Sequence, residues 1–150
     1  MNIIIEGCDG TGKSTLAKYL CDILGLRYWH ESMPRTFAEY KSMLEYGGMV
    51  FDRFCLGQFI YNEEKDRKLT EQELTTLVSE IFPKTNTILI YVDCSTDTII
   101  QRLIQRGEGN TGVRTAMEKW VKNIRGSYRE LLSKIGVKYI EIDGGKQHVL

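Results

Sequence analysis

The sequence predicts a three-layer α/β fold in which a five-stranded parallel sheet is flanked by helices. Short apolar runs alternate with segments of helical periodicity along most of the 150-residue chain, which is typical of a parallel sheet covered on both faces. A glycine-rich turn also joins the first apolar run directly to the first helical segment. A chain of this length is expected to bury one core, so residues 1–150 are taken as a single domain.

Each element has a local signal. The predicted strands are 2–6, 27–30, 49–52, 87–93 and 137–142, and the predicted helices are 13–24, 36–46, 70–81, 95–106 and 115–135. Leu16, Leu20 and Leu24 recur at helical spacing in the first helix, and Gly47 closes the second. Thr70 and Glu73 form a capping box at the start of the third helix. Pro83 is expected to end that helix, and the glycine-rich segment 107–112 separates the last two helices.

Composition excludes several classes of function. The 20 Lys and Arg residues balance the 20 Asp and Glu residues, so no net field attracts nucleic acid or an anionic membrane. The longest apolar run, 88–92, is far shorter than the ~20 residues that span a bilayer. The first residues resemble no export signal, so a cytoplasmic location is expected. The four cysteines and two histidines lack the spacing of a zinc site or a catalytic triad.

The most informative motif is Gly-Cys-Asp-Gly-Thr-Gly-Lys-Ser at 7–14, which matches the phosphate-binding loop (P-loop) pattern GxxxxGK[ST] and is followed by Thr15. Glycines let successive backbone N–H groups face phosphate oxygens, Lys13 supplies a cation, and Ser14 offers a hydroxyl to Mg²⁺. The alternative is a turn that only links a strand to a helix. The motif predicts ATP and Mg²⁺ as cofactors. The residues assigned to ATP are Gly7, Asp9, Gly10, Thr11, Gly12, Lys13, Ser14, Thr15 and Arg102.

A second motif carries a resemblance to a known family. Asp52-Arg53-Phe54-x-x-Gly57-x-x-Ile60-Tyr61-Asn62 resembles the Asp-Arg-Tyr-x-x-Ser-x-x-Ala-Tyr-Gln signature of thymidylate kinases. Residues 5–15 are similar to the P-loop of that family, and 91–93 with 102–107 to its fourth strand and lid. The similarity touches roughly residues 2 to 145, and related deoxynucleoside kinases share its outline.

The resemblance implies an enzyme that transfers the γ-phosphate of ATP to dTMP or a related deoxynucleoside monophosphate. A deoxynucleoside kinase acting on a 5′-hydroxyl is the near alternative, and it would need a carboxylate base such as Glu31 or Asp52. A nucleotide-dependent switch without turnover is the third class. The chain is shorter than usual for the family between Glu31 and Met49, where contacts to the base are expected. The sequence leaves open whether two copies form a homodimer.

Two carboxylates are candidates for holding Mg²⁺ together with Ser14. Asp52 ends a strand that should lie beside the P-loop strand, and it is the better candidate. Asp93 is the second candidate, although it could instead cap the helix that follows it.

The acceptor site is assigned mainly from the resemblance, which places Arg53 on the acceptor phosphate and Asp9 toward the sugar 3′-hydroxyl. Glu31 could contact the same region or be a solvated loop carboxylate. Four aromatic residues are candidates for stacking on the base or packing on the sugar, with core packing favoured for each: Phe37, Tyr40, Phe54 and Tyr61.

Phosphoryl transfer also needs positive charge beyond Lys13 and Mg²⁺. Some thymidylate kinases carry an arginine in the P-loop, but Gly10-Thr11 occupies this stretch here. The charge is therefore expected from a lid at about 102–115, where Arg106 and Arg114 flank the glycine-rich segment. The predicted catalytic residues are Lys13, Arg53, Arg106 and Arg114, while Arg102 could also be a solvated helix end.

Overall fold

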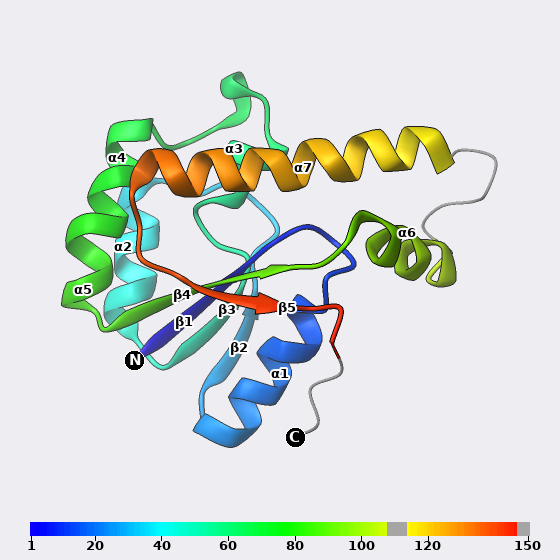
Figure 1. The fold of residues 1–150 in the computed structure, drawn as a ribbon. Coiled ribbons are helices and arrows are strands. Elements are labelled where there is room, and N and C mark those ends of the chain that lie inside the picture. Colours follow the sequence, from blue (N-terminus) through cyan, green and yellow to red (C-terminus); the bar gives the residue numbers. More distant parts are fainter. Residues whose placement is uncertain (108–113, 147–150) are drawn as a thin grey trace.

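The computed structural model describes residues 1–107 and 114–146. Its strands form one sheet, in which every pair is parallel and the order is β2-β3-β1-β4-β5 (Figure 1). The strands are β1 (Asn2–Glu6), β2 (Arg27–His30), β3 (Met49–Asp52), β4 (Thr87–Asp93) and β5 (Ile140–Asp143). The predicted fold class is confirmed.

Helices cover both faces of the sheet and complete three layers (Figure 1). They are α1 (Lys13–Leu24), α2 (Phe37–Tyr46), α3 (Gly57–Tyr61), α4 (Glu71–Thr76), α5 (Phe82–Lys84), α6 (Thr96–Gln105) and α7 (Arg114–Ile135). On one face Ile3, Ile5 and Val50 pack with Ala17 of α1. The core on the opposite face contains side chains of α2, α4 and α7. In the described part of the chain, no helix is long and apolar enough to cross a bilayer.

The structure corrects two of the predicted elements and adds two that were not predicted. The helix expected to end before Pro83 continues to Lys84 through a π-helical turn, Leu77–Ile81. Pro83 lies just after this π-helical turn, which interrupts the regular i→i−4 hydrogen-bond pattern and so accommodates a residue without an N–H. The last strand begins at Ile140 rather than at residue 137. Helix α3 and the short 3₁₀ turn Glu64–Asp66 were not predicted.

Four of the strands end on an acidic residue at the same edge of the sheet: Glu6, Asp52, Asp93 and Asp143. This common edge follows from the parallel register, which pairs Ile5 with Asp52 and Asp93 with Asp143. Because β1 lies between β3 and β4, the P-loop that follows β1 leaves the sheet at the centre of this edge. Ligands of open parallel sheets bind at such an edge.

Candidate active site

The P-loop is held against the neighbouring strand β4. Gly7 has φ +151°, and a Cβ there would lie 2.3 Å from the carbonyl oxygen of Val92, so no larger residue fits. Thr11 fastens the loop by donating its hydroxyl to the Cys8 carbonyl at 2.8 Å. Lys13 is buried and donates its Nζ to the same carbonyl at 3.0 Å. Burial and the positive charge of Arg53 both lower the pKa of Lys13.

The structure brings together the two residues expected to hold Mg²⁺. Ser14 Oγ donates to Asp52 Oδ2 at 2.6 Å, while Asp52 Oδ1 is buried without a hydrogen-bond partner. Burial raises the pKa of Asp52, but the hydroxyls of Ser14 and Tyr28 and the charge of Lys13 outweigh it and lower the pKa below its usual value. An ionised carboxylate with a free oxygen beside a hydroxyl is a donor set that suits Mg²⁺.

Two residues of this cluster were missed from the sequence. Tyr28 donates its hydroxyl to Asp52 Oδ2 at 2.7 Å, and His30 Nδ1 lies 3.5 Å from the same oxygen. Both belong to the edge strand β2, which pairs with β3 so that His30 is beside Asp52. The available signal was their spacing of two residues in a predicted strand, which places both side chains on one face.

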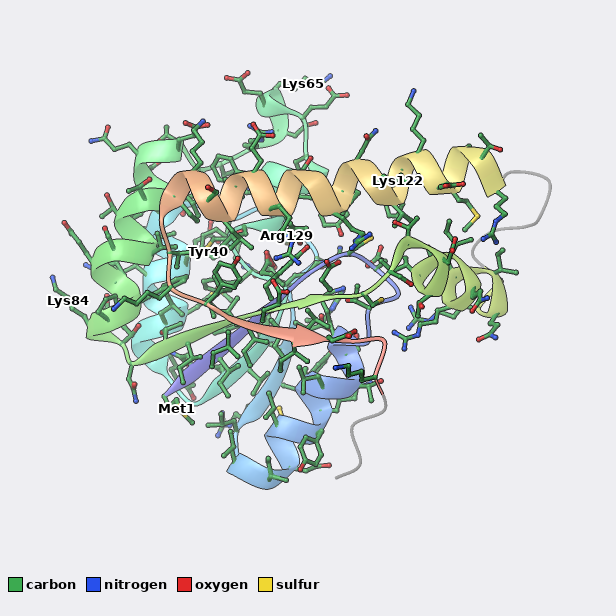
Figure 2. The ribbon with its side chains drawn as sticks, in the orientation of Figure 1. Met1, Tyr40, Lys65, Lys84, Lys122 and Arg129 are labelled. Carbon is green, nitrogen blue, oxygen red and sulfur yellow. The ribbon has the colours of Figure 1, made fainter. Side chains whose placement is uncertain are left out.

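Asp93 is occupied by a different contact. Arg125 of α7 binds it in a fork, with Nε–Oδ1 at 2.8 Å and Nη2–Oδ2 at 3.0 Å. Arg129 of the same helix adds a bond to Oδ2 at 3.0 Å, and Figure 2 shows it pointing toward the sheet. The alternative in which Asp93 caps α6 is wrong, because the N-cap is Ser95. Asp93 therefore ties α7 to the end of β4, and this ion pair was not predicted.

Arg53 points to a different part of the site from its neighbour Asp52. Its φ of +68° is rare for a residue with a side chain, and it redirects the chain at the end of β3. The guanidinium forms an ion pair with Asp9 of the P-loop and stacks 4.3 Å from the ring centroid of Tyr61. Asp9 and Arg53, predicted on the acceptor side, are thus brought into contact.

A cavity of about 90 Å³ adjoins this pair. It is lined by Glu31, Ser32, Met33, Pro34, Tyr40, Arg53, Phe54, Gly57, Gln58, Tyr61 and Asn62. Five of the predicted acceptor residues, Glu31, Tyr40, Arg53, Phe54 and Tyr61, are among them. Glu31 is not a solvated carboxylate, because it is buried and accepts from Arg35 Nε at 2.6 Å.

Neither of the two phenylalanines predicted at the acceptor site is free to stack on a base. Phe54 is buried between Tyr40 and Phe51, with ring centroids at 4.6 and 4.4 Å, so core packing accounts for most of its surface. Phe37 is not brought to the site. It lies in the first turn of α2 and lines a separate hollow with Lys41 and Thr76, on the side of α2 that faces the π-helical turn and α4.

A larger cavity of about 460 Å³ lies on the other side of the P-loop. It is lined by Thr11, Gly12, Thr15, Leu16, Tyr19, Val92, Arg102, Arg106, Ile142, Gly144 and Lys146. Predicted ATP-site residues thus meet here with Tyr19, Gly144 and Lys146, which were not predicted. Gly144 was hard to foresee, because its role depends on a close approach in which a Cβ would lie 1.9 Å from the Thr11 carbonyl oxygen.

The predicted lid arginines have three different surroundings. Arg102 is not a solvated helix end, because it donates to the carbonyls of Gly10 at 3.1 Å and Gly144 at 2.8 Å and so bridges the P-loop to the segment after β5. Arg106 lines the larger cavity. Arg114 is exposed and pairs with Asp97 of α6 at 3.2 Å. The centre of the predicted lid, residues 108–113, lies outside the described residues.

Comparisons with known proteins support the fold. No protein-family model matches the chain, and no curated relative was found. Its structure is similar to that of YorR from Bacillus subtilis in complex with phosphorylated GDP, with 24% identity, a TM-score of 0.80, and 97% of this chain and 87% of the other covered. Deoxyadenosine kinase from M. mycoides with bound dCTP gives 21% identity and a TM-score of 0.62, covering 98% and 92% of the two chains. Shikimate kinase from Aquifex aeolicus has 18% identity and a TM-score of 0.55, with 98% of this chain and 88% of the other covered.

These likenesses show that the chain has the fold of P-loop kinases. The resemblance predicted from the motifs is therefore confirmed at the level of the fold. The narrower assignment to thymidylate kinases stays a prediction.

Proposed function

We propose that this protein is an ATP- and Mg²⁺-dependent kinase that phosphorylates dTMP or a related deoxynucleoside monophosphate. The observation that carries the proposal is the divergence of two consecutive side chains. Asp52 is bonded to Ser14 of the P-loop, while Arg53 lines the smaller cavity with Tyr61. This divergence supports a site in which Asp52 would serve a metal-binding side and Arg53 a cationic acceptor side.

The residues on each side have distinct roles in phosphoryl transfer. Ser14 and Asp52 would hold Mg²⁺, which when bound neutralises charge on the ATP phosphates. Lys13, beside the loop carbonyls, supplies a fixed cation for the same phosphates, and Arg106 at the larger cavity would add a second. The planar fork of Arg53 can bind two oxygens of an acceptor phosphate. A phosphate acceptor is already an anion, so this reaction needs no general base.

A deoxynucleoside kinase is the second candidate, and one observation favours it. The Glu31 carboxylate is buried at the smaller cavity and could accept the proton of a 5′-hydroxyl. Arg35, which donates a hydrogen bond to Glu31, would then hold the carboxylate in place. The fold shared with deoxyadenosine kinase is compatible with either acceptor.

A substrate panel separates the two candidates. Purified protein is given ATP and Mg²⁺ with each common deoxynucleoside or its 5′-monophosphate, and ADP release is measured. We expect turnover with one or more monophosphates and none with the matching nucleosides. Lys13→Ala is the negative control, and its kcat should be lower than that of the wild type by on the order of 10²-fold or more. Turnover of thymidine or another nucleoside without its monophosphate would replace the proposal by the second candidate.

A further inference from the structure

Behind Arg53 lies a buried carboxyl group that the proposed mechanism does not use. Glu6, the last residue of β1, is fully buried, and its Oε1 accepts the backbone N–H of Phe54 at 2.8 Å. Phe54 directly follows Arg53, whose left-handed backbone aims the guanidinium at the acceptor cavity. Glu6 therefore fixes the turn that gives Arg53 its direction.

The two side chains also border the same space. A Cβ placed on Gly57 would lie 3.8 Å from Glu6 Oε1 and 4.0 Å from Arg53 Cδ. Glu6 Oε2 and Arg53 Nε are both buried without hydrogen-bond partners. Other ionisable groups surround Glu6: Lys13 of α1, Asp52 of β3, Cys55 after β3, Tyr61 of α3, Tyr128 of α7, and Tyr91 of β4, which is paired with Glu6 in the sheet.

The charge on Glu6 is finely balanced. Burial raises its pKa to about 7, while the Phe54 N–H and the charges of Arg53 and Lys13 oppose the rise. An anion bound to Arg53 adds negative charge near this carboxyl group and favours its neutral form. By thermodynamic linkage, the neutral form then binds the anion more tightly.

We propose that Glu6 is the positioning residue of Arg53 and takes up one proton from solvent, on its carboxyl group, when an anionic acceptor binds Arg53. The Oε1 bond to Phe54 keeps the turn in place in either protonation state. The proton removes one of two negative charges that act on Arg53 together with the acceptor phosphate, the other being the ion-pair partner Asp9. This inference rests on the proposed acceptor role of Arg53.

Two substitutions separate the positioning role from the charge. Glu6→Gln retains an oxygen for the Phe54 N–H but cannot ionise, whereas Glu6→Ala loses both. Glu63→Gln is the matched control, because the Glu63 side chain is exposed and pairs with Lys65 on the surface. KM for dTMP, dAMP, dGMP or dCMP, whichever the panel selects, and KM for ATP are measured from pH 6 to pH 9.

With the wild type, the acceptor KM should rise from pH 6 to pH 9 by roughly tenfold more than with Glu6→Gln, because the ionised carboxylate and the acceptor phosphate repel each other in a protein interior. At every pH, the acceptor KM of Glu6→Ala should be about tenfold above that of Glu6→Gln, because Glu6→Ala also loses the buried hydrogen bond that orients Arg53. The dependence of KM for ATP on pH should be the same in the wild type and in every variant. Parallel acceptor profiles for the wild type and Glu6→Gln would overturn the proton uptake, and an unchanged KM in Glu6→Ala would overturn the positioning role.

A measurement on the unmutated protein keeps the inference testable if the Glu6 variants do not fold. Calorimetric titration with the same monophosphate at pH 7.5, in two buffers of different ionisation heat, counts the protons taken up on binding. Uptake beyond that of the acceptor phosphate itself is expected, and none would overturn the inference. If Arg53→Ala leaves the acceptor KM unchanged, the proposed function has failed instead.

Discussion

At the scale of single residues, the site is organised by contacts between residues far apart in the sequence. Asp52 receives hydroxyls from Ser14 and Tyr28, and Arg53 pairs with Asp9. The P-loop spacing predicted Ser14 and Lys13 because that motif is local. Tyr28 could not be predicted as a partner of Asp52, because the contact depends on which strand lies next to β3. The sequence also gave no signal for the ion pair between Asp93 and Arg125.

The buried carboxyl group of Glu6 leads to a prediction about stability and pH. Its pKa is raised from 4.5 to about 7 in the folded protein, so the folded state binds more protons than the unfolded state between these values. The resulting stabilisation is complete below pH 4.5 and is lost as the pH rises through 7. The glutamine of Glu6→Gln does not ionise, so this variant does not show the same loss of stability with rising pH.

The free energy of unfolding of Glu6→Gln, relative to the wild type, should therefore increase by on the order of 3 kcal/mol between pH 5 and pH 8. Urea titrations of both proteins at the two pH values measure this change, with Glu63→Gln as the control. A constant difference between Glu6→Gln and the wild type at both pH values would show that Glu6 is ionised throughout this range.

At the scale of elements, strands and long helices were predicted more accurately than short connections. The bounds of β1 and α1 match the prediction because apolar periodicity and the glycine-rich turn are local signals. Helix α3 was missed because it has only five residues and its C-terminal carbonyls are satisfied from outside. Arg67 donates to the carbonyls of Gln58, Phe59 and Asn62, a contact that no local pattern indicates. The glycine-rich segment cannot be compared, because 108–113 lie outside the described residues.

Helix α7 is joined to the sheet through Asp93, so this contact should contribute to stability. Asp93→Ala leaves Arg125 and Arg129 without their shared carboxylate and should lower the free energy of unfolding by about 1–3 kcal/mol. Lys122→Ala is the comparison, because it removes only the exposed pair with Glu118 and should cost under about 1 kcal/mol. Chemical denaturation at neutral pH measures both. Equal losses would mean that the Asp93 ion pair does not hold α7.

The contribution of Asp93 should also depend on pH. Burial raises its pKa, but the bonds and charges of Arg125 and Arg129 outweigh this and lower the pKa below its usual value. The stabilisation is therefore present above the ordinary aspartate pKa and is lost as the pH falls through the lowered one. The difference between Asp93→Ala and the wild type should shrink in acid.

At the scale of the whole molecule, a chain with no net charge concentrates its functional groups at one edge of the sheet. The central position of β1 sets the P-loop between a larger cavity of about 460 Å³ and a smaller one of about 90 Å³. In the proposed function, ATP occupies the larger cavity and the acceptor phosphate meets Arg53 at the smaller. The fold and the P-loop could be predicted from the sequence, whereas the division into two cavities depends on tertiary packing around Arg53 and Gly144.

The central claim is that Arg53 binds the phosphate of the acceptor, and the steady-state kinetics of Arg53→Ala test it most directly. Arg27→Ala is the matched control, because Arg27 is an exposed arginine on β2 whose side chain contacts Tyr46. Losing the two charge-assisted hydrogen bonds of the guanidinium should raise KM for the monophosphate by roughly 10- to 100-fold, while KM for ATP changes by less than about twofold. An Arg53→Ala enzyme with an unchanged acceptor KM would contradict the account.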